Sequence, residues 1–249
     1  MTTQPQNTSQ PHSTTRPASK THNDILQRFA NACIDWLYPP TCMACKILLP
    51  LNDPSRTAIW LCETCESLLE PSPEPHIAPF KYEGILRDII RDIKFRHRKN
   101  HARALGRLWA KHMTAPILIH PPTEITLVPM PLHRNKQRAR GFNQAELLTQ
   151  ELARSWGLPM EKTLIRIIDT PPQAGLHPAR RIENVSGAFA IAPGCVVTGK
   201  KYVLIDDIYT TGASINECVR TLMSHGAADV QFMTLTQTAK KAQDAKDTN

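Results

Sequence analysis

One segment constrains the fold more than any other: an apolar run that ends in two carboxylates and leads at once into a hydroxyl-rich turn. Residues 203–205 (Val-Leu-Ile) precede Asp206 and Asp207, and residues 210–214 (Thr-Thr-Gly-Ala-Ser) follow closely. The apolar run predicts a buried strand, and the turn predicts the start of a helix over 213–225. Because ligands of open α/β sheets bind at the carboxyl ends of strands, the segment predicts an α/β fold with a binding site here.

The same segment carries the groups that a sugar phosphate needs. Free N–H groups at a helix N-terminus, together with three hydroxyls, form a cradle for an anion, and a glycine lets the backbone approach closely. Carboxylates accept hydrogen bonds from ribose hydroxyls, directly or through Mg²⁺. The predicted ribose ligands are Asp206 and Asp207, and the predicted phosphate cradle is Thr210, Thr211, Gly212, Ala213 and Ser214. The simpler alternative is a strand end followed by an ordinary helix cap, which needs only one such side chain.

Four of the seven cysteines form two close pairs. Cys42 and Cys45 are separated by two residues, and after sixteen residues Cys62 and Cys65 repeat the spacing. Each pair can turn both thiolates toward one ion, and two pairs complete a closed four-thiolate site, which is typical of structural zinc. The alternative is four unrelated buried thiols, and Lys46 stands where such zinc knuckles often carry glycine. The pattern suits a reduced compartment better than a disulfide framework.

Two stretches of the chain are strongly basic. Residues 134–144 hold four basic side chains and no acid, namely Arg134, Lys136, Arg138 and Arg140. We expect a mobile cationic loop that closes over a pyrophosphate leaving group; a solvated loop or a nucleic-acid contact are the alternatives. Residues 87–111 hold nine Lys or Arg against two Asp. They predict a solvated helical face over an apolar stripe, with a DNA or RNA surface as the sharper alternative. His97 and His101 are expected to be surface residues rather than metal ligands.

The remaining pattern predicts strands that alternate with helices, and therefore a mostly parallel sheet. The strands are expected over 78–82, 125–128, 163–167, 185–191, 202–205 and 230–235, and the helices over 84–113, 143–156 and 213–225. No stretch approaches the ~18 apolar residues of a membrane helix, and residues 1–20 contain no signal-peptide core. An integral membrane protein and a secreted protein are therefore not expected. The net charge of +8 suits an acidic partner or a phosphorylated ligand.

Composition divides the chain into five predicted parts. They are a disordered tail (1–22), a helix with the four-cysteine zinc ribbon (23–70), a Pro-rich linker (71–75), the α/β domain (76–240) and a flexible tail (241–249). Because only fourteen residues follow the last predicted strand, we expect any cover over the carboxylates to come from the N-terminal side. The zinc ribbon and the basic helices over 84–113 are the candidates for that cover.

Residues 203–214 match the signature with which type I phosphoribosyltransferases bind phosphoribosyl pyrophosphate (PRPP). Together with the cysteine pairs and further motifs, the chain resembles the ComF family of competence-associated proteins, which join a double zinc ribbon to a type I phosphoribosyltransferase-like domain. The resemblance covers about residues 36–238. Its further motifs lie at 38–45, 128–133, 140–144, 172–176 and 181–189.

The resemblance implies a cytoplasmic protein of natural competence that handles incoming single-stranded DNA. It also implies PRPP binding with Mg²⁺, in which Asp206 and Asp207 hold the ribose and residues 210–214 hold the 5′-phosphate. As an enzyme, the protein would transfer the phosphoribosyl group and release pyrophosphate, which Arg140 and its basic neighbours would neutralise. The alternative is a non-catalytic, PRPP-sensing adaptor that binds single-stranded DNA or the DNA-uptake machinery. The low aromatic content, 6%, argues against an extended base-stacking platform.

Overall fold

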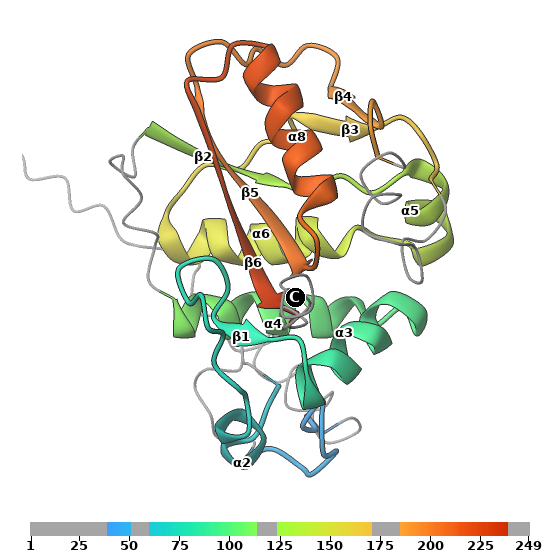
Figure 1. Ribbon diagram of the computed structural model, residues 1–249. Coiled ribbons are helices and arrows are strands. Elements are labelled where there is room, and N and C mark those ends of the chain that lie inside the picture. Colours follow the sequence, from blue (N-terminus) through green and yellow to red (C-terminus); the bar gives the residue numbers. More distant parts are fainter. Residues whose placement is uncertain (1–38, 51–59, 114–123, 171–184, 239–249) are drawn as a thin grey trace, which may run out of the picture. The chain divides into compact units, whose positions relative to one another are not determined.

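The computed structural model describes residues 39–50, 60–113, 124–170 and 185–238 (Figure 1). Its helices are α2 (Glu63–Ser67), α3 (Gly84–Phe95), α4 (Lys99–His112), α5 (Arg134–Arg140), α6 (Gln144–Trp156) and α8 (Ala213–Ser224). Its strands are β1 (Phe80–Lys81), β2 (Ile125–Pro129), β3 (Leu164–Arg166), β4 (Phe189–Ile191), β5 (Lys201–Tyr209) and β6 (Asp229–Gln237). The two predicted tails, the predicted helix after residue 22 and the motif at 172–176 lie outside the described residues.

A parallel sheet of four strands, in the order β1-β6-β5-β2, forms the centre of the fold. β3 and β4 pair separately as an antiparallel ribbon. β5 lies between β6 and β2, so the strand that carries the two carboxylates is flanked on both sides. The expected mostly parallel sheet with flanking helices is confirmed.

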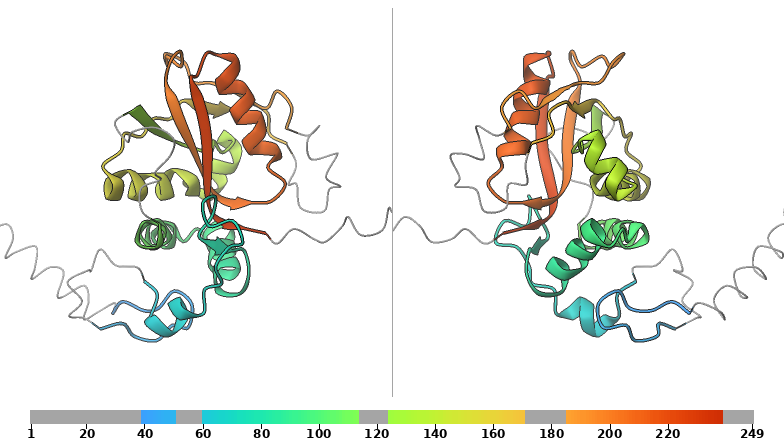
Figure 2. Two further views of the ribbon diagram at one scale, coloured as in Figure 1. Left: turned by 60° about the vertical axis from the view of Figure 1, so that its left-hand side comes forward. Right: turned by 90° about the vertical axis from the view of Figure 1, so that its right-hand side faces the viewer.

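The side chains of β5 alternate between two hydrophobic cores, as the pleat of a strand requires. Val203 and Ile205 belong to the core that α4 and α6 complete, whereas Tyr202 and Leu204 belong to the core under α8. Figure 2 shows α8 on one side of the sheet and α6 on the other. Burial on both faces explains why this strand is a continuous apolar run in the sequence.

The basic stretch expected as one long helix over 84–113 is two helices. α3 ends at Phe95 and α4 begins at Lys99, and between them His97 has a left-handed backbone with φ of 56°. Each helix has its own apolar face: Ile90 and Ile93 of α3 and Leu105 and Leu108 of α4 are buried. Apolar spacing did not reveal the corner, because the apolar residues of both helices had been assigned to one face of a single long helix.

The expectation of a mobile loop at 134–144 is wrong for its first seven residues, which form α5. His133 caps this helix, since its Nδ1 accepts a hydrogen bond from the Asn135 N–H at 3.3 Å. Gly141 ends it in the left-handed conformation, with φ of 81°. A capping side chain at the start and a left-handed glycine at the end both stabilise a short helix. The basic side chains are therefore carried by a helix and not by a loop.

The residues predicted as a Pro-rich linker contact the sheet. The Ser72 N–H bonds to the Pro79 carbonyl at 3.0 Å, and the Ser72 hydroxyl donates to Gln237 Oε1 at 3.1 Å. The cysteine module and the sheet fall in one structural unit that begins at Thr41. Among the described residues no helix is both long and apolar enough to cross a membrane.

Candidate functional site

The two carboxylates lie where β5 reaches the carboxyl edge of the sheet. Asp206 is half-buried and Asp207 is buried. Asp206 Oδ1 accepts the backbone N–H of Asp207 at 2.8 Å, and the hydroxyl of Thr236 on β6 donates to the Asp207 carbonyl at 2.9 Å. These bonds fix the backbone of the acidic pair and leave carboxylate oxygens for a ligand.

The turn after β5 opens directly into α8. Thr210 and Thr211 are exposed, and Gly212 precedes the first helical residue with φ of 73°. A Cβ at Gly212 would lie 2.8 Å from the Tyr209 hydroxyl, so both the backbone angle and the space require glycine. The N-cap residue of α8 is Gly212, which makes no side-chain capping bond. A helix N-terminus that follows a glycine in this way is where phosphate sites form in other proteins.

A lysine from α3 reaches the acidic pair. Lys94 Nζ lies 2.6 Å from Asp207 Oδ2. Burial by itself would raise the pKa of Asp207, but the Lys94 ammonium holds that pKa below its ordinary value. Burial and the adjacent charge of Asp207 raise the pKa of Asp206 well above its ordinary value. The two carboxyl groups therefore differ in how readily they ionise, with Asp207 the more acidic of the pair.

Arg140, at the last turn of α5, is the basic residue of the 134–144 stretch that the structure brings to the carboxylates. Burial lowers the pKa of Arg140, and the charges of Asp207 and Asp206 oppose that shift. The Arg140 guanidinium also bonds to Gln144 Oε1, and the Arg140 carbonyl lies 2.9 Å from His97 Nδ1. The end of α5 therefore meets the chain just after α3, the helix whose Lys94 contacts Asp207.

The four paired cysteines converge on one point. The Sγ atoms of Cys42, Cys45, Cys62 and Cys65 all lie within 4.8 Å of one another. The Cys45 and Cys62 sulfurs are 3.7 Å apart. Four thiolates at the usual Zn–S distance of about 2.3 Å would be separated by about 3.8 Å along each edge of a tetrahedron. The cluster could therefore hold a zinc ion, with all four positions filled by protein.

The surroundings of the cysteines shift the pKa values of two of the thiols in opposite directions. The pKa of Cys65 is raised to about 12 by burial and by its three neighbouring thiols. Burial also opposes ionisation of Cys42, but backbone N–H groups, including that of Cys62 at 3.4 Å, lower its pKa to about 6. Lys46 has φ of 65°, a left-handed backbone conformation that favours glycine.

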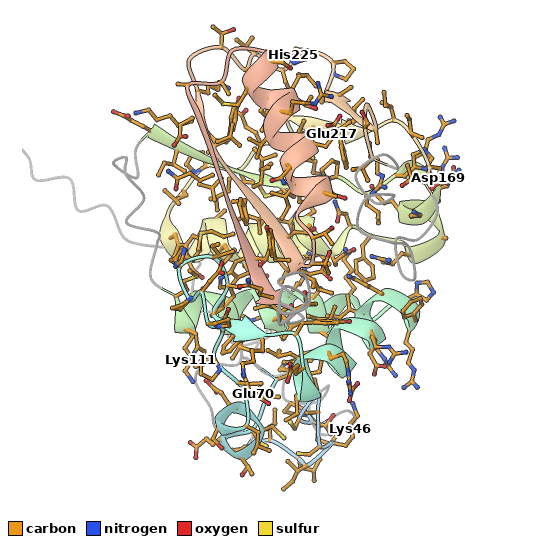
Figure 3. All side chains as sticks on the ribbon, viewed as in Figure 1. Lys46, Glu70, Lys111, Asp169, Glu217 and His225 are labelled. Atoms are coloured by element: carbon orange, nitrogen blue, oxygen red, sulfur yellow. The ribbon has the colours of Figure 1, made fainter. Side chains whose placement is uncertain are left out.

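The cysteine module contacts α4. Glu66 of α2 accepts from Lys111 Nζ at 2.6 Å and pairs with His112 Nε2 at 2.7 Å (Lys111 is labelled in Figure 3). The Trp60 ring packs edge-on against the His101 ring, with centroids 6.3 Å apart. Of the two expected covers, α3 touches the acidic pair through Lys94, whereas these described contacts of the cysteine module run to α4.

Proteins similar in sequence are named for DNA use and competence. DNA utilization protein YhgH of Salmonella typhi is 32% identical over 193 residues, which cover 76% of this chain and 82% of that protein. Competence protein F of Haemophilus influenzae is 34% identical over 107 residues, 42% of this chain and 47% of its own. Competence protein ComFC of Bacillus subtilis is 29% identical over 157 residues, 63% of this chain and 61% of its own. The chain belongs to the ComF family. No protein-family model matches it.

Among solved structures, a hypoxanthine phosphoribosyltransferase of Staphylococcus aureus is similar to this ComF-family chain with a TM-score of 0.31. It is 14% identical, and the match covers 57% of this chain and 64% of that one. The ComF-family chain has a mostly parallel sheet with flanking helices, joined to an N-terminal cysteine cluster.

The other predicted basic ligands of the ComF-family chain lie away from the carboxylates. Arg134 and Arg138 are exposed on α5. Lys136 donates to the Thr170 carbonyl at 2.7 Å and lies 3.6 Å from Asp169 Oδ1. Asp169, labelled in Figure 3, also accepts from Asn135 Nδ2 at 3.0 Å. These contacts tie α5 to the chain after β3.

Sequence reasoning missed three residues of this region: Lys94, Asp169 and Arg166. Arg166 is oriented by the Phe189 ring, whose centroid lies 5.3 Å from its Cζ, and it interacts electrostatically with Asp206. It also lines a cavity of about 630 Å³ at the carboxyl end of β2. Lys94 stood in a run of basic residues that matched a solvated face, so spacing gave no signal for its role. Asp169 is an acidic residue that directly follows apolar residues after β3. That placement was the signal in the sequence by which its role could have been found.

Proposed function

We propose that this ComF-family protein binds PRPP at the carboxyl end of β5. The observation that carries the proposal is the placement of two buried or half-buried carboxylates beside an uncapped, glycine-opened helix N-terminus. Asp206 and Asp207 would accept hydrogen bonds from the ribose hydroxyls, and residues 210–214 would hold the 5′-phosphate. Mg²⁺ would arrive on the pyrophosphate oxygens, where proteins usually bind this ion.

The arrangement also suits transfer of the phosphoribosyl group. In that reaction the bond from ribose C1 to pyrophosphate breaks as an acceptor attacks, and positive charge develops on the ribose ring. Asp206 and Asp207 would hold the ribose in position, and Arg140 would neutralise the departing pyrophosphate. A PRPP sensor needs only to bind PRPP and hold its ribose in position. The enzyme hypothesis and the adaptor hypothesis both require this binding. We also propose that the cysteine cluster holds a structural zinc ion.

Calorimetric titration with PRPP and Mg²⁺ tests the proposal. We expect the double variant Asp206→Asn with Asp207→Asn to bind at least about 100-fold more weakly than the wild type, because two hydrogen bonds to charged groups are worth about 3 to 6 kcal/mol. Asp88→Asn, an exposed change on α3, is the matched control and should bind normally. A folded, zinc-loaded wild type that binds no PRPP would contradict the proposal, and pyrophosphate release with candidate acceptors would separate enzyme from sensor.

A second candidate function, binding of single-stranded DNA, is favoured by the corner between α3 and α4. The side chain of Phe95 is 75% exposed there, which is unusual for an aromatic residue. Four exposed basic or histidine side chains follow it over 96–99. An exposed ring can stack on a base while its cationic neighbours contact phosphates. The names of the Salmonella and Haemophilus relatives, which refer to DNA use and competence, support this candidate.

Replacing the basic side chains of that corner with neutral ones is expected to weaken DNA binding and to reduce the dependence of the affinity on salt. The triple variant Arg96→Gln, Arg98→Gln and Lys99→Gln should reduce the salt slope for a single strand by about 2, since each phosphate contact contributes about 0.7. Phe95→Ala should weaken binding by about 1 to 3 kcal/mol without changing the slope. Fluorescence anisotropy at several salt concentrations measures both quantities.

The matched control for that experiment removes three other lysines, Lys81, Lys162 and Lys200, which pair with acids elsewhere on the surface. It carries the same change in net charge. Equal loss of affinity and slope in the control and the corner variant would mean that net charge alone attracts DNA, and would contradict a specific contact at the corner.

A further inference from the structure

The ion pair between Lys94 and Asp207 is enclosed by protein. The lysine side chain is 23% exposed and the aspartate side chain 6%, with the charged atoms 2.6 Å apart. Surface ion pairs contribute little because water screens them, whereas a pair at this depth is screened much less. Removal of either partner would leave a buried charge, so the two side chains are strongly coupled.

The position of Lys94 is fixed from both sides of α3. On one side Ile90 and Ile93 are buried in the core beneath the helix. On the other side His97, with its left-handed backbone at φ of 56°, presents Nδ1 to the Arg140 carbonyl at 2.9 Å. Such a backbone conformation is costly for a residue with a side chain, and it persists where surrounding contacts hold it. The end of α3 is therefore fastened to the end of α5 next to the acidic pair.

Organic cations already accompany the acidic pair. Asp206 and Asp207 face the Lys94 ammonium, and the Arg140 guanidinium interacts with both carboxyl groups. A divalent ion at Asp207 would have to displace the Lys94 ammonium from the carboxylate. It would then be repelled by the positive charges of Lys94 and Arg140 nearby. Hydroxyl groups meet no such repulsion, because they can donate hydrogen bonds to the carboxylate oxygens that the lysine does not use.

We propose that Lys94 is a built-in counter-ion that excludes divalent metal from Asp207 and reserves the acidic pair for an uncharged diol, the vicinal hydroxyls of a sugar phosphate. This inference rests on the proposed function for its ligand, but its effect on metal binding does not. Lys94 thereby determines the specificity of the site, and metal enters only with the phosphate groups of the ligand.

Mn²⁺ in the absence of any sugar phosphate is the probe, and electron paramagnetic resonance counts the ions bound to the full-length, zinc-loaded protein. We expect Lys94→Met to gain a site that holds Mn²⁺ at least about tenfold more tightly than the wild type. The double variant Lys94→Met with Asp207→Asn should lose that site, and Lys94→Arg should behave as the wild type. Lys200→Met is the matched control, because it frees Glu161, a half-buried carboxylate, from its lysine at 2.9 Å; it should gain no site.

Equal Mn²⁺ binding by the wild type and Lys94→Met would overturn the proposal. A second measurement on the wild type covers the case in which Lys94→Met does not fold. Calorimetry with ribose 5-phosphate, which lacks pyrophosphate, should give the same affinity with and without Mg²⁺, within about twofold. Binding that Mg²⁺ strengthens more than about tenfold would also overturn the role of Lys94. If ribose 5-phosphate does not bind at all, the proposed function fails, and the Mn²⁺ comparison still decides the role of Lys94.

Discussion

Replacing Cys65 with serine is expected to release zinc and to unfold the cysteine module. Cys65 is 5% exposed, and its Sγ lies within 4.8 Å of the other three sulfurs. A structural zinc site contributes about 10 to 16 kcal/mol of apparent binding energy that the folded state alone receives, so loss of one ligand removes several kcal/mol. Zinc per chain, measured by mass spectrometry, should fall from one toward zero, and the melting temperature should fall with it.

The effect should extend beyond the module because its residues belong to a larger core. Cys42, Met43 and Leu61 are buried in the same cluster as Leu105 and Leu108 of α4. Chelation of the wild type should therefore reproduce the loss of stability seen in Cys65→Ser. The control is Cys195→Ser, a half-buried cysteine outside the cluster, which should change stability by about 0.5 kcal/mol or less. Full zinc content in Cys65→Ser would contradict the four-thiolate site.

Replacing Glu151 with alanine is expected to destabilise the fold by about 2 to 4 kcal/mol, or roughly 5 to 15 °C in melting temperature. Glu151 of α6 is 3% exposed, and its carboxylate pairs with Arg103 and Arg107 of α4 at 3.4 Å and with Arg154 at 2.7 Å. Without the acid, two partly buried guanidinium groups of α4 lose their counter-ion. Thermal and urea unfolding of the full chain measure the change.

The neighbouring arginine gives a control within the same cluster. Arg154 is 68% exposed although its ion pair with Glu151 is the shortest of the three. Arg154→Ala should therefore cost less than about 1 kcal/mol, as exposed pairs do. If Glu151→Ala and Arg154→Ala lowered the free energy of unfolding equally, burial of the Glu151 carboxylate would not determine its contribution to stability. Glu151 is also closely packed against α4, because a Cβ on Gly106 would lie 2.8 Å from the Glu151 Cβ.

Several features followed from local sequence alone, because short-range physics controls them. The two C-x2-C pairs predicted a cluster, and the structure brings all four sulfurs together. The apolar run before Asp206 predicted a strand with its carboxyl end at a candidate site, since only burial on both faces tolerates such a run. Gly212 and Gly141 occupy left-handed positions that favour glycine.

Other features depended on tertiary contacts, which spacing does not encode. A pattern of basic residues cannot distinguish an exposed lysine from Lys94, whose ammonium reaches a buried carboxylate only because the end of α3 meets the end of β5. The stretch after β2 contained the cap and the glycine of a helix, yet its charge density outweighed them and indicated a loop. The corner at His97 depends on a left-handed backbone angle and on a contact with Arg140 of α5, and spacing reveals neither.

The sequence by itself therefore determined the class of fold, the cysteine cluster and the position of the acidic pair, because each depends on residues close together in the chain. Only the tertiary structure decided which cations accompany the carboxylates. Lys94 of α3, Arg140 of α5 and Asp207 of β5 are far apart in sequence, and their charges interact because the fold brings these three elements together where Asp207 is buried. Burial and distance, rather than residue type, determine which charges form the site.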